Sequence, residues 1–143
     1  MSAVSFPGTL ESLAPIGAFT LAAAAAAGLD GHASYRLRLA VDEVATNIIV
    51  HGYAEAGLTG MLVLSMHLDP GALTLDIEDT GVPFDVMSVS LPTEEDLTCP
   101  LDERAMGGLG LFLITKSVDA FHHESTGLKN RTTLVMYRRR GET

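Results

Sequence analysis

The sequence predicts an α+β fold: a two-layer α/β sandwich with a mixed, mainly antiparallel sheet and its helices on one face. Two observations lead to this class. Residues 12–52 have the spacing of two successive helices, and apolar runs from residue 61 onward are broken by turn signals typical of paired strands. Helices grouped beside such strands favour the sandwich. The length of 143 residues suits one domain with its own core.

The first elements are a short strand near residues 4–6 and a helix that Ser12 or Pro15 opens and Gly28 closes. Residues 12–29, SLAPIGAFTLAAAAAAGL, carry no charge and have roughly the length of a membrane span. They consist mostly of alanine, however, and no basic segment precedes them as in a signal peptide. We expect a closely packed helix, with no transmembrane segment and no export signal.

The second helix is expected over residues 31–52, where the periodicity separates two neighbouring lines of side chains. The apolar line is Leu37, Val41, Val44 and Ile48. The polar line beside it is Arg36, Glu43 and Asn47. The helix therefore has a face for packing and a polar edge next to it.

The second half of the chain predicts strands around one irregular segment. Residues 61–68 and 72–77 are apolar runs joined by an Asp-Pro-Gly turn. Residues 82–106 lack periodicity, which in a compact domain indicates a functional or mobile segment. A glycine-rich run then opens a helix at 111–118. Two final strands, near 120–125 and 132–137, are joined by a turn at Gly127.

Charge and cysteine content exclude several classes of function. The formal net charge of −9 repels phosphate backbones, so nucleic acid is not expected as a partner. The basic run Arg138 to Arg140 is expected to be a solvated strand end. Cys99 is the single cysteine and lies in a proline-flanked stretch, so we expect a loop cysteine without catalytic function. The absence of an internal disulfide suits a cytoplasmic protein.

Glu43 and Asn47 are the first candidate site residues. Their i, i+4 spacing places both side chains on the same side of a helix. An asparagine carbonyl oxygen can bind Mg²⁺, which takes few protein ligands and keeps water and phosphate oxygens around it. A glutamate one turn away could accept a proton from a nearby hydroxyl or water. Taken alone, the pair is better explained as a solvated helix edge.

Two further motifs could bind a nucleotide. Asp79 follows a strand and could accept a hydrogen bond from a ring amino group, and Gly81 would let a flat ligand approach the backbone. Residues 107–110, Gly-Gly-Leu-Gly, precede a helix, where free backbone N–H groups and the helix dipole favour phosphate. The alternatives are an Asp-x-Gly turn that ends a strand and a flexible hinge.

The histidines do not predict a metal site. His122 and His123 are adjacent on an expected strand, where neighbouring side chains point to opposite faces and chelate poorly. We therefore expect strand and surface histidines. His51 could orient the glutamate or a phosphate, but its position favours a packed or capping residue at the helix end.

In this order and spacing, the motifs resemble the N, G1 and G2 boxes of the GHKL (Bergerat-fold) ATPase superfamily. Within it the chain looks like the anti-sigma factor serine/threonine-protein kinases of the RsbW and SpoIIAB type. The stretches that carry the resemblance are LAVDEVATNIIVHGY, DIEDTGVPFD, ERAMGGLGLFLITKSVDAF and NRTTLVMYRR. It extends from about Leu10 to Arg139, and the whole chain, 1–143, would be one such domain. Position 83 is a proline where the common G1 pattern has glycine, a variant that these small kinases share.

The resemblance implies a role for each candidate residue. The implied assignments are Asn47 for Mg²⁺, Asp79 for the adenine amino group, Gly81 beneath the ring, Thr133 or Thr132 for support of adenine with Thr133 as first choice, Gly108 and Gly110 for phosphate, an ATP lid at about 85–107, and Glu43 as general base. Apart from these, Arg104 could close over phosphate, although its position does not favour that role. The polar edge of the second helix would then be a catalytic edge.

The resemblance also implies partners. The protein would be an ATP- and Mg²⁺-dependent kinase that phosphorylates an anti-anti-sigma protein with a STAS domain and binds a sigma factor. A PP2C-type phosphatase would act on the same antagonist, and the kinase would form a homodimer. The alternative is a non-catalytic, nucleotide-dependent binding module that sequesters a regulatory partner. A third candidate is an ATPase that acts without a protein substrate.

Overall fold

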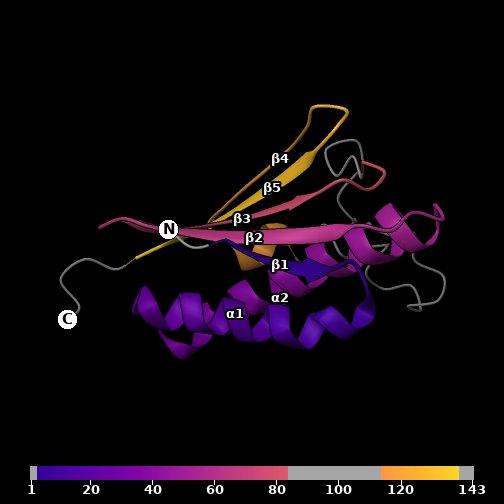
Figure 1. Ribbon diagram of the computed structural model, residues 1–143. Coiled ribbons are helices and arrows are strands. Elements are labelled where there is room, and N and C mark those ends of the chain that lie inside the picture. Colours follow the sequence, from indigo (N-terminus) through magenta and orange to yellow (C-terminus); the bar gives the residue numbers. More distant parts are fainter. Residues whose placement is uncertain (1–2, 84–113, 139–143) are drawn as a thin grey trace, which may run out of the picture.

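The computed structural model describes residues 3–83 and 114–138 and forms two layers, a five-stranded sheet with helices across one face (Figure 1). This arrangement confirms the predicted α+β class. The elements are β1 (Ala3–Pro7), the 3-10 helix η1 (Leu10–Ser12), α1 (Leu13–Ala26), α2 (Gly31–Asn47), the π-helix η2 (Ile48–Ala54), β2 (Met61–Leu68), β3 (Ala72–Asp79), β4 (Ala120–Ser125) and β5 (Asn130–Tyr137). Residues 114–117 are also helical.

The sheet has the strand order β1-β2-β3-β5-β4, and each of these neighbouring pairs is antiparallel. The expectation of a mixed sheet is therefore wrong for the described strands, because even β3 and β5, which are not consecutive in the chain, run antiparallel. The predicted short first strand is confirmed as the edge strand β1. The centre of the sheet is β3, which pairs Asp79 with Asn130 at the start of β5.

The core lies between the sheet and the helices, as the alternation along the strands requires. In β3 every second residue is buried, and β5 alternates in the same way. Apolar side chains from these faces meet the predicted apolar line of α2, all of which is buried. The fully buried side chains include Ile16, Leu37, Val41, Leu62, Leu64, Leu73, Leu75, Ile77, Leu134 and Met136.

Helix α1 ends as predicted, since Gly28 follows it with a φ of 74°. A positive φ of this kind favours glycine and stops the helix. The small alanine side chains let α1 pack closely beside α2, and three of the buried positions are alanines, Ala23, Ala24 and Ala27. In the part of the chain that the structure describes, no helix combines the length and apolar character required to cross a membrane.

Helix α2 begins with a side-chain cap and changes its winding after Asn47. The Asp30 carboxylate accepts a hydrogen bond of 2.8 Å from the Ala33 N–H. The sequence predicted one helix up to Gly52, but the turns from Ile48 to Ala54 are π-helical. In this segment the N–H of Glu55 donates to the carbonyl of Val50, five residues earlier. The wider turn brings Gly52 and Tyr53 into the interior.

Arg138 differs from its predicted role. Its Nε donates to the carbonyl of Ala27 at 2.9 Å, and its Nη1 donates to the carbonyl of Asp69 at 2.8 Å. The guanidinium therefore connects the end of α1 with the turn between β2 and β3. The prediction of a solvated side chain is wrong for Arg138, because unpaired helix-end and turn carbonyls are available beside it. Arg139 and Arg140 lie outside the described residues.

Candidate functional site

The site is organised around Asp79, the last residue of β3. Its side chain is 5% exposed, and its Oδ1 accepts two hydrogen bonds, at 2.9 Å from the Gly81 N–H and at 2.8 Å from Asn130 Nδ2. Burial raises the pKa of Asp79, and the hydrogen bonds from Asn130 and Gly81 oppose that rise. A buried carboxylate with one oxygen occupied can offer the other to a ligand.

The turn after Asp79 rests on the π-helix. A Cβ added to Gly81 would lie 2.7 Å from the carbonyl oxygen of Gly52. The Val82 N–H also donates to that oxygen at 2.9 Å. The space that a side chain would need at position 81 is therefore filled by backbone, so the fold requires glycine there whether or not a ring lies nearby.

Tyr53 fixes the same turn from the other side. Its hydroxyl donates to the Met61 carbonyl at 2.7 Å and accepts from the Thr80 N–H at 3.0 Å. Its ring is 1% exposed and lies against Gly8 and Gly60, where an added Cβ would come within 2.9 Å of ring atoms. Through Tyr53, the π-helix thus connects the start of β2 with the turn that follows Asp79.

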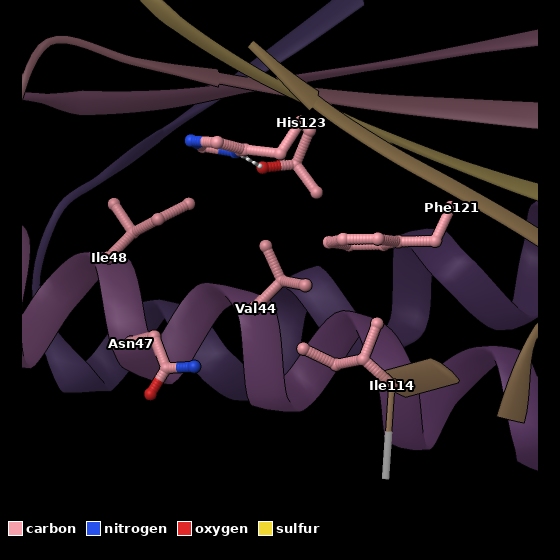
Figure 2. A pocket seen from close by; sticks show the side chains of 7 residues that line it. Val44, Asn47, Ile48, Ile114, Phe121 and His123 are labelled. Atoms are coloured by element: carbon pink, nitrogen blue, oxygen red, sulfur yellow. Dashed lines mark hydrogen bonds between the residues drawn. The ribbon is translucent and has the colours of Figure 1, made fainter. Parts of the chain in front are cut away.

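A small cavity lies between α2 and the β4–β5 hairpin (Figure 2). Val44 and Ile48 point from the helix toward Phe121 and His123 of β4, and Asn47 lies on the flank of the helix. The remaining lining residues are Ile114 and Thr132. Opposite the helix, His123 Nδ1 and Thr132 Oγ1 form a hydrogen bond of 3.0 Å. The lining residues are mostly apolar, and the polar ones are Asn47, His123 and Thr132.

Glu43 and Asn47 are brought to one flank of α2, as their spacing predicts. Both are half-buried, and the described part of the chain gives neither side chain a hydrogen bond or an ion pair. Burial raises the pKa of Glu43, and the neighbouring Asp42 carboxylate adds to that rise. Asn47 adjoins the cavity, and Glu43 precedes it by one helical turn.

Thr133, the first choice for support of adenine, lies on the wrong face of the sheet. Its Oγ1 donates to Asp76 Oδ1 at 2.6 Å, and Asp76 belongs to the face of β3 that the helices do not cover. Thr132, the alternative, is buried and lines the cavity. The choice of Thr133 is therefore corrected to Thr132, because neighbouring strand residues point to opposite faces.

The other sequence candidates are only partly described. Gly108 and Gly110, the expected lid at 85–107, Arg104 and Cys99 lie outside the described residues. His122 and His123 do point to opposite faces, but His123 lines the cavity and is no surface residue. His51 lies 2.7 Å from Glu55 at the helix end. Within residues 3–83 and 114–138, no group of histidine, cysteine or acidic side chains is arranged to hold a metal ion.

Sequence reasoning missed three residues of this site, Asn130, Tyr53 and His123. Asn130 precedes the predicted last strand, and its pairing with Asp79 depends on strand register. Tyr53 is the last residue of the stretch LAVDEVATNIIVHGY and was assigned no role. The glycines at positions 8 and 60 were a usable signal, since close approach to a ring explains both.

Comparison with known proteins identifies relatives in sequence and in fold. Curated relatives include the serine-protein kinase RsbW of Halalkalibacterium halodurans, 34% identical over 84 residues, and RsbW of Bacillus cereus strain AH820, 31% identical over 84 residues. Each match covers 58% of this chain and 50% or 51% of the relative. The chain thus matches about half the length of these relatives.

Two solved structures share the fold. A chain of the SiaB–SiaC complex from Pseudomonas aeruginosa matches with a TM-score of 0.56 and 15% identity, over 93% of this chain and 88% of that one. The histidine kinase domain of the blue-light activated histidine kinase from Erythrobacter litoralis EL346 matches with a TM-score of 0.54 and 17% identity, over 88% and 60%. The sequence-family model of the histidine kinase-like ATPase domain matches residues 6–137 of this chain. The predicted superfamily is confirmed, and the chain belongs to the histidine kinase-like ATPase domain family.

Proposed function

We propose that this protein is an ATP- and Mg²⁺-dependent serine/threonine protein kinase of a partner-switching system. It would phosphorylate an anti-anti-sigma antagonist with a STAS domain and act as an anti-sigma factor. Family membership supports nucleotide binding, and relatives named serine-protein kinase RsbW support the finer assignment. Because the match spans only about half of those relatives, the reaction and the partners are inferred.

The observation that carries the proposal is the position of Asn47 at the cavity, with Glu43 one helical turn before it on the same flank of α2. The amide oxygen of Asn47 is a ligand of the kind that Mg²⁺ accepts, and Asn47 is among the residues that line the cavity. Neither Glu43 nor Asn47 is engaged by another described side chain, so both remain available to ligands. A helix edge used only for solvation would not need a half-buried carboxylate with a raised pKa.

Residues near the end of β3 and the start of β5 carry groups that suit a nucleobase. Asp79 would accept from the adenine amino group through Oδ2, since Oδ1 already receives two donors. Thr132 lines the cavity, and its hydroxyl would support the ring directly or through water. Gly81 would lie beneath the ring through its backbone.

In the reaction, Mg²⁺ and ATP would supply charge neutralisation and the phosphoryl group. Glu43 would accept the proton of a serine or threonine hydroxyl on the partner as that oxygen becomes phosphorylated. A pKa above that of an exposed glutamate makes the carboxylate a better base at neutral pH. The remaining catalysis would come from positioning, as in other phosphoryl transfers.

Residues outside the described part complete the proposed site. Gly108 and Gly110 would contact phosphate through backbone N–H groups, and the segment 85–107 would act as the lid. The whole chain, 1–143, would form one such domain. The unphosphorylated antagonist would compete with a sigma factor, phosphorylation would release the antagonist, and a PP2C-type phosphatase would reverse the switch in the cytoplasm.

A thermal-shift titration with ATP and ADP tests the nucleotide site. Nucleotide at a hundredfold excess over its dissociation constant should stabilise the fold by about 2.7 kcal/mol. Asn47→Ala should remove the Mg²⁺-dependent part of this shift. His32→Ala, at an exposed position near the start of the same helix, should keep it. If nucleotide-free protein shows no shift, the kinase proposal is wrong.

Phosphotransfer to a purified STAS protein tests the chemistry. Glu43→Gln should abolish transfer and leave ATP affinity nearly unchanged, because it removes the base and keeps the shape. Full transfer by this variant would refute the assignment of Glu43. Nucleotide binding without transfer to any antagonist would favour the non-catalytic binding module.

A further inference from the structure

Asn130 occupies a place in the site that the proposed function does not explain. It is the first residue of β5 and lies directly opposite Asp79 in the ladder between β3 and β5. Its side chain belongs to the helix-facing side of the sheet and is 3% exposed. A buried amide at a strand start costs free energy unless its hydrogen bonds are satisfied, so its partners are informative.

The side-chain NH₂ of Asn130 donates to two acceptors at once. The Nδ2 atom lies 2.8 Å from Asp79 Oδ1 and 2.9 Å from the carbonyl oxygen of Gly81. Both partners can only accept when Asp79 is ionised, so the opposite orientation of the amide would place oxygen against oxygen. The orientation of Asn130 is therefore fixed by its neighbours.

These bonds decide which oxygen of Asp79 is left for a ligand. Oδ1 receives the Asn130 amide and the Gly81 N–H. From the described residues no hydrogen bond reaches Oδ2. The carboxylate is thus held in one rotation, with Oδ2 as its remaining acceptor.

We infer that Asn130 is a positioning residue of the nucleobase site, which makes the site select a purine with an amino group at position 6 over one with a carbonyl there. The inference rests on the proposed nucleotide site. An amino group can donate to Oδ2, whereas a carbonyl would set two acceptors against each other in a buried place. A site that recognises a polar group in this way rejects an analogue that leaves the polar atoms of the site unpaired.

The electrostatics of Asp79 support the same role. Burial favours the neutral carboxyl, which raises its pKa, and the hydrogen bond from Asn130 is the largest influence that opposes this rise. A protonated Asp79 could donate to a 6-carbonyl and would weaken the preference for a 6-amino purine. By favouring the ionised form, Asn130 keeps Oδ2 an acceptor only.

Calorimetric titration of the full chain with ADP and IDP tests the inference, because these two nucleotides differ at position 6. Wild-type protein should bind ADP at least tenfold more tightly than IDP. Asn130→Ala should weaken ADP binding about tenfold and leave IDP binding almost unchanged, so that the preference is lost. Thr133→Val is the matched control, since it removes another β5 donor to a β3 carboxylate, on the uncovered face. It should change neither affinity.

A second variant keeps the test decisive if Asn130→Ala does not fold. Asn130→Asp keeps the size but turns the donor into an acceptor, so the loss of ADP affinity should be larger at pH 8 than at pH 6, where a shared proton can restore the bond. An unchanged ADP-to-IDP ratio in both variants would overturn the inference. Absence of any ADP binding by wild-type protein would instead overturn the proposed function.

Discussion

Gly81 lies in direct backbone contact with Gly52, so the turn that follows Asp79 is seated on the π-helix that follows Asn47. A Cβ at position 81 would come within 2.7 Å of the Gly52 carbonyl oxygen, and the Val82 N–H donates to that oxygen. The two halves of the candidate site, the flank of α2 and the end of β3, therefore meet through main chain rather than through adaptable side chains.

Gly81→Ala should separate these two halves. The added methyl group meets backbone that cannot rotate away, so we expect a loss of about 1–3 kcal/mol in the free energy of unfolding. Nucleotide affinity should fall as well, since Asp79 moves with the turn. Urea denaturation and calorimetry measure both effects. Gly31→Ala is the control, because position 31 is open and begins a helix, where alanine should not destabilise. Equal stability of both variants would contradict the contact.

Tyr53→Phe should destabilise the protein although it removes only one oxygen atom. The Met61 carbonyl and the Thr80 N–H would both lose their partner in the interior, at a cost of about 1–3 kcal/mol. Equilibrium unfolding in urea measures the loss. Tyr137→Phe provides the comparison, since that ring is 60% exposed and its change should stay within about 0.5 kcal/mol. Similar values for the two variants would show that the Tyr53 hydroxyl contributes little.

Glu43→Gln should stabilise the fold at neutral pH while it removes phosphotransfer. The pKa of Glu43 is higher in the folded state than in the unfolded chain. At neutral pH, where the carboxyl is ionised in both states, its charge therefore disfavours the folded state. The gain from glutamine should therefore be present at pH 7 and vanish below the pKa of an unfolded glutamate. Thermal unfolding at pH 4 and pH 7 provides the measurement. If the stability of Glu43→Gln relative to wild type were lower at pH 7 than at pH 4, the expected effect would be contradicted.

Arg138→Ala should cost more than the loss of an arginine at an ordinary strand end. Two charge-assisted hydrogen bonds to the carbonyls of Ala27 and Asp69 disappear, and we expect about 1–3 kcal/mol by urea denaturation. Arg131→Ala is the comparison, because that exposed side chain pairs with Glu78 on the uncovered face and its loss should change stability little. If both changes are equally mild, the bonds of Arg138 do not hold the end of α1.

The sequence was sufficient for the fold class because the periodicities are strong. The apolar line of α2 and the alternation in β3 each bury their predicted face. The π-helix was not predictable, since a pattern read at 3.6 residues per turn does not mark where the turn widens. The failure at Thr133 has a similar origin. Thr132 and Thr133 differ only in the face of the sheet that they occupy. Which of them faces the helices depends on the register of β5 with β3.

The candidate site was predictable where its residues follow one another on a single element. Glu43 and Asn47 share a helix face by spacing alone. Asn130 reaches Asp79 across 51 positions of sequence, and its role appears only when β5 is placed beside β3. Tyr53 acts through backbone groups of residues that it does not neighbour in the chain. Such contacts depend on topology, which residue patterns did not determine.

The π-helix also limits how this segment can tolerate insertions and deletions. A π-turn holds one residue more than an α-turn, so the path from Asn47 to Gly52 has a fixed residue count. Deletion of a single residue there would replace the wide turn with ordinary winding and disturb the contact of Gly52 with the turn at Gly81. Homologues that vary freely in the loop between α1 and α2 should therefore keep the number of residues in this segment constant.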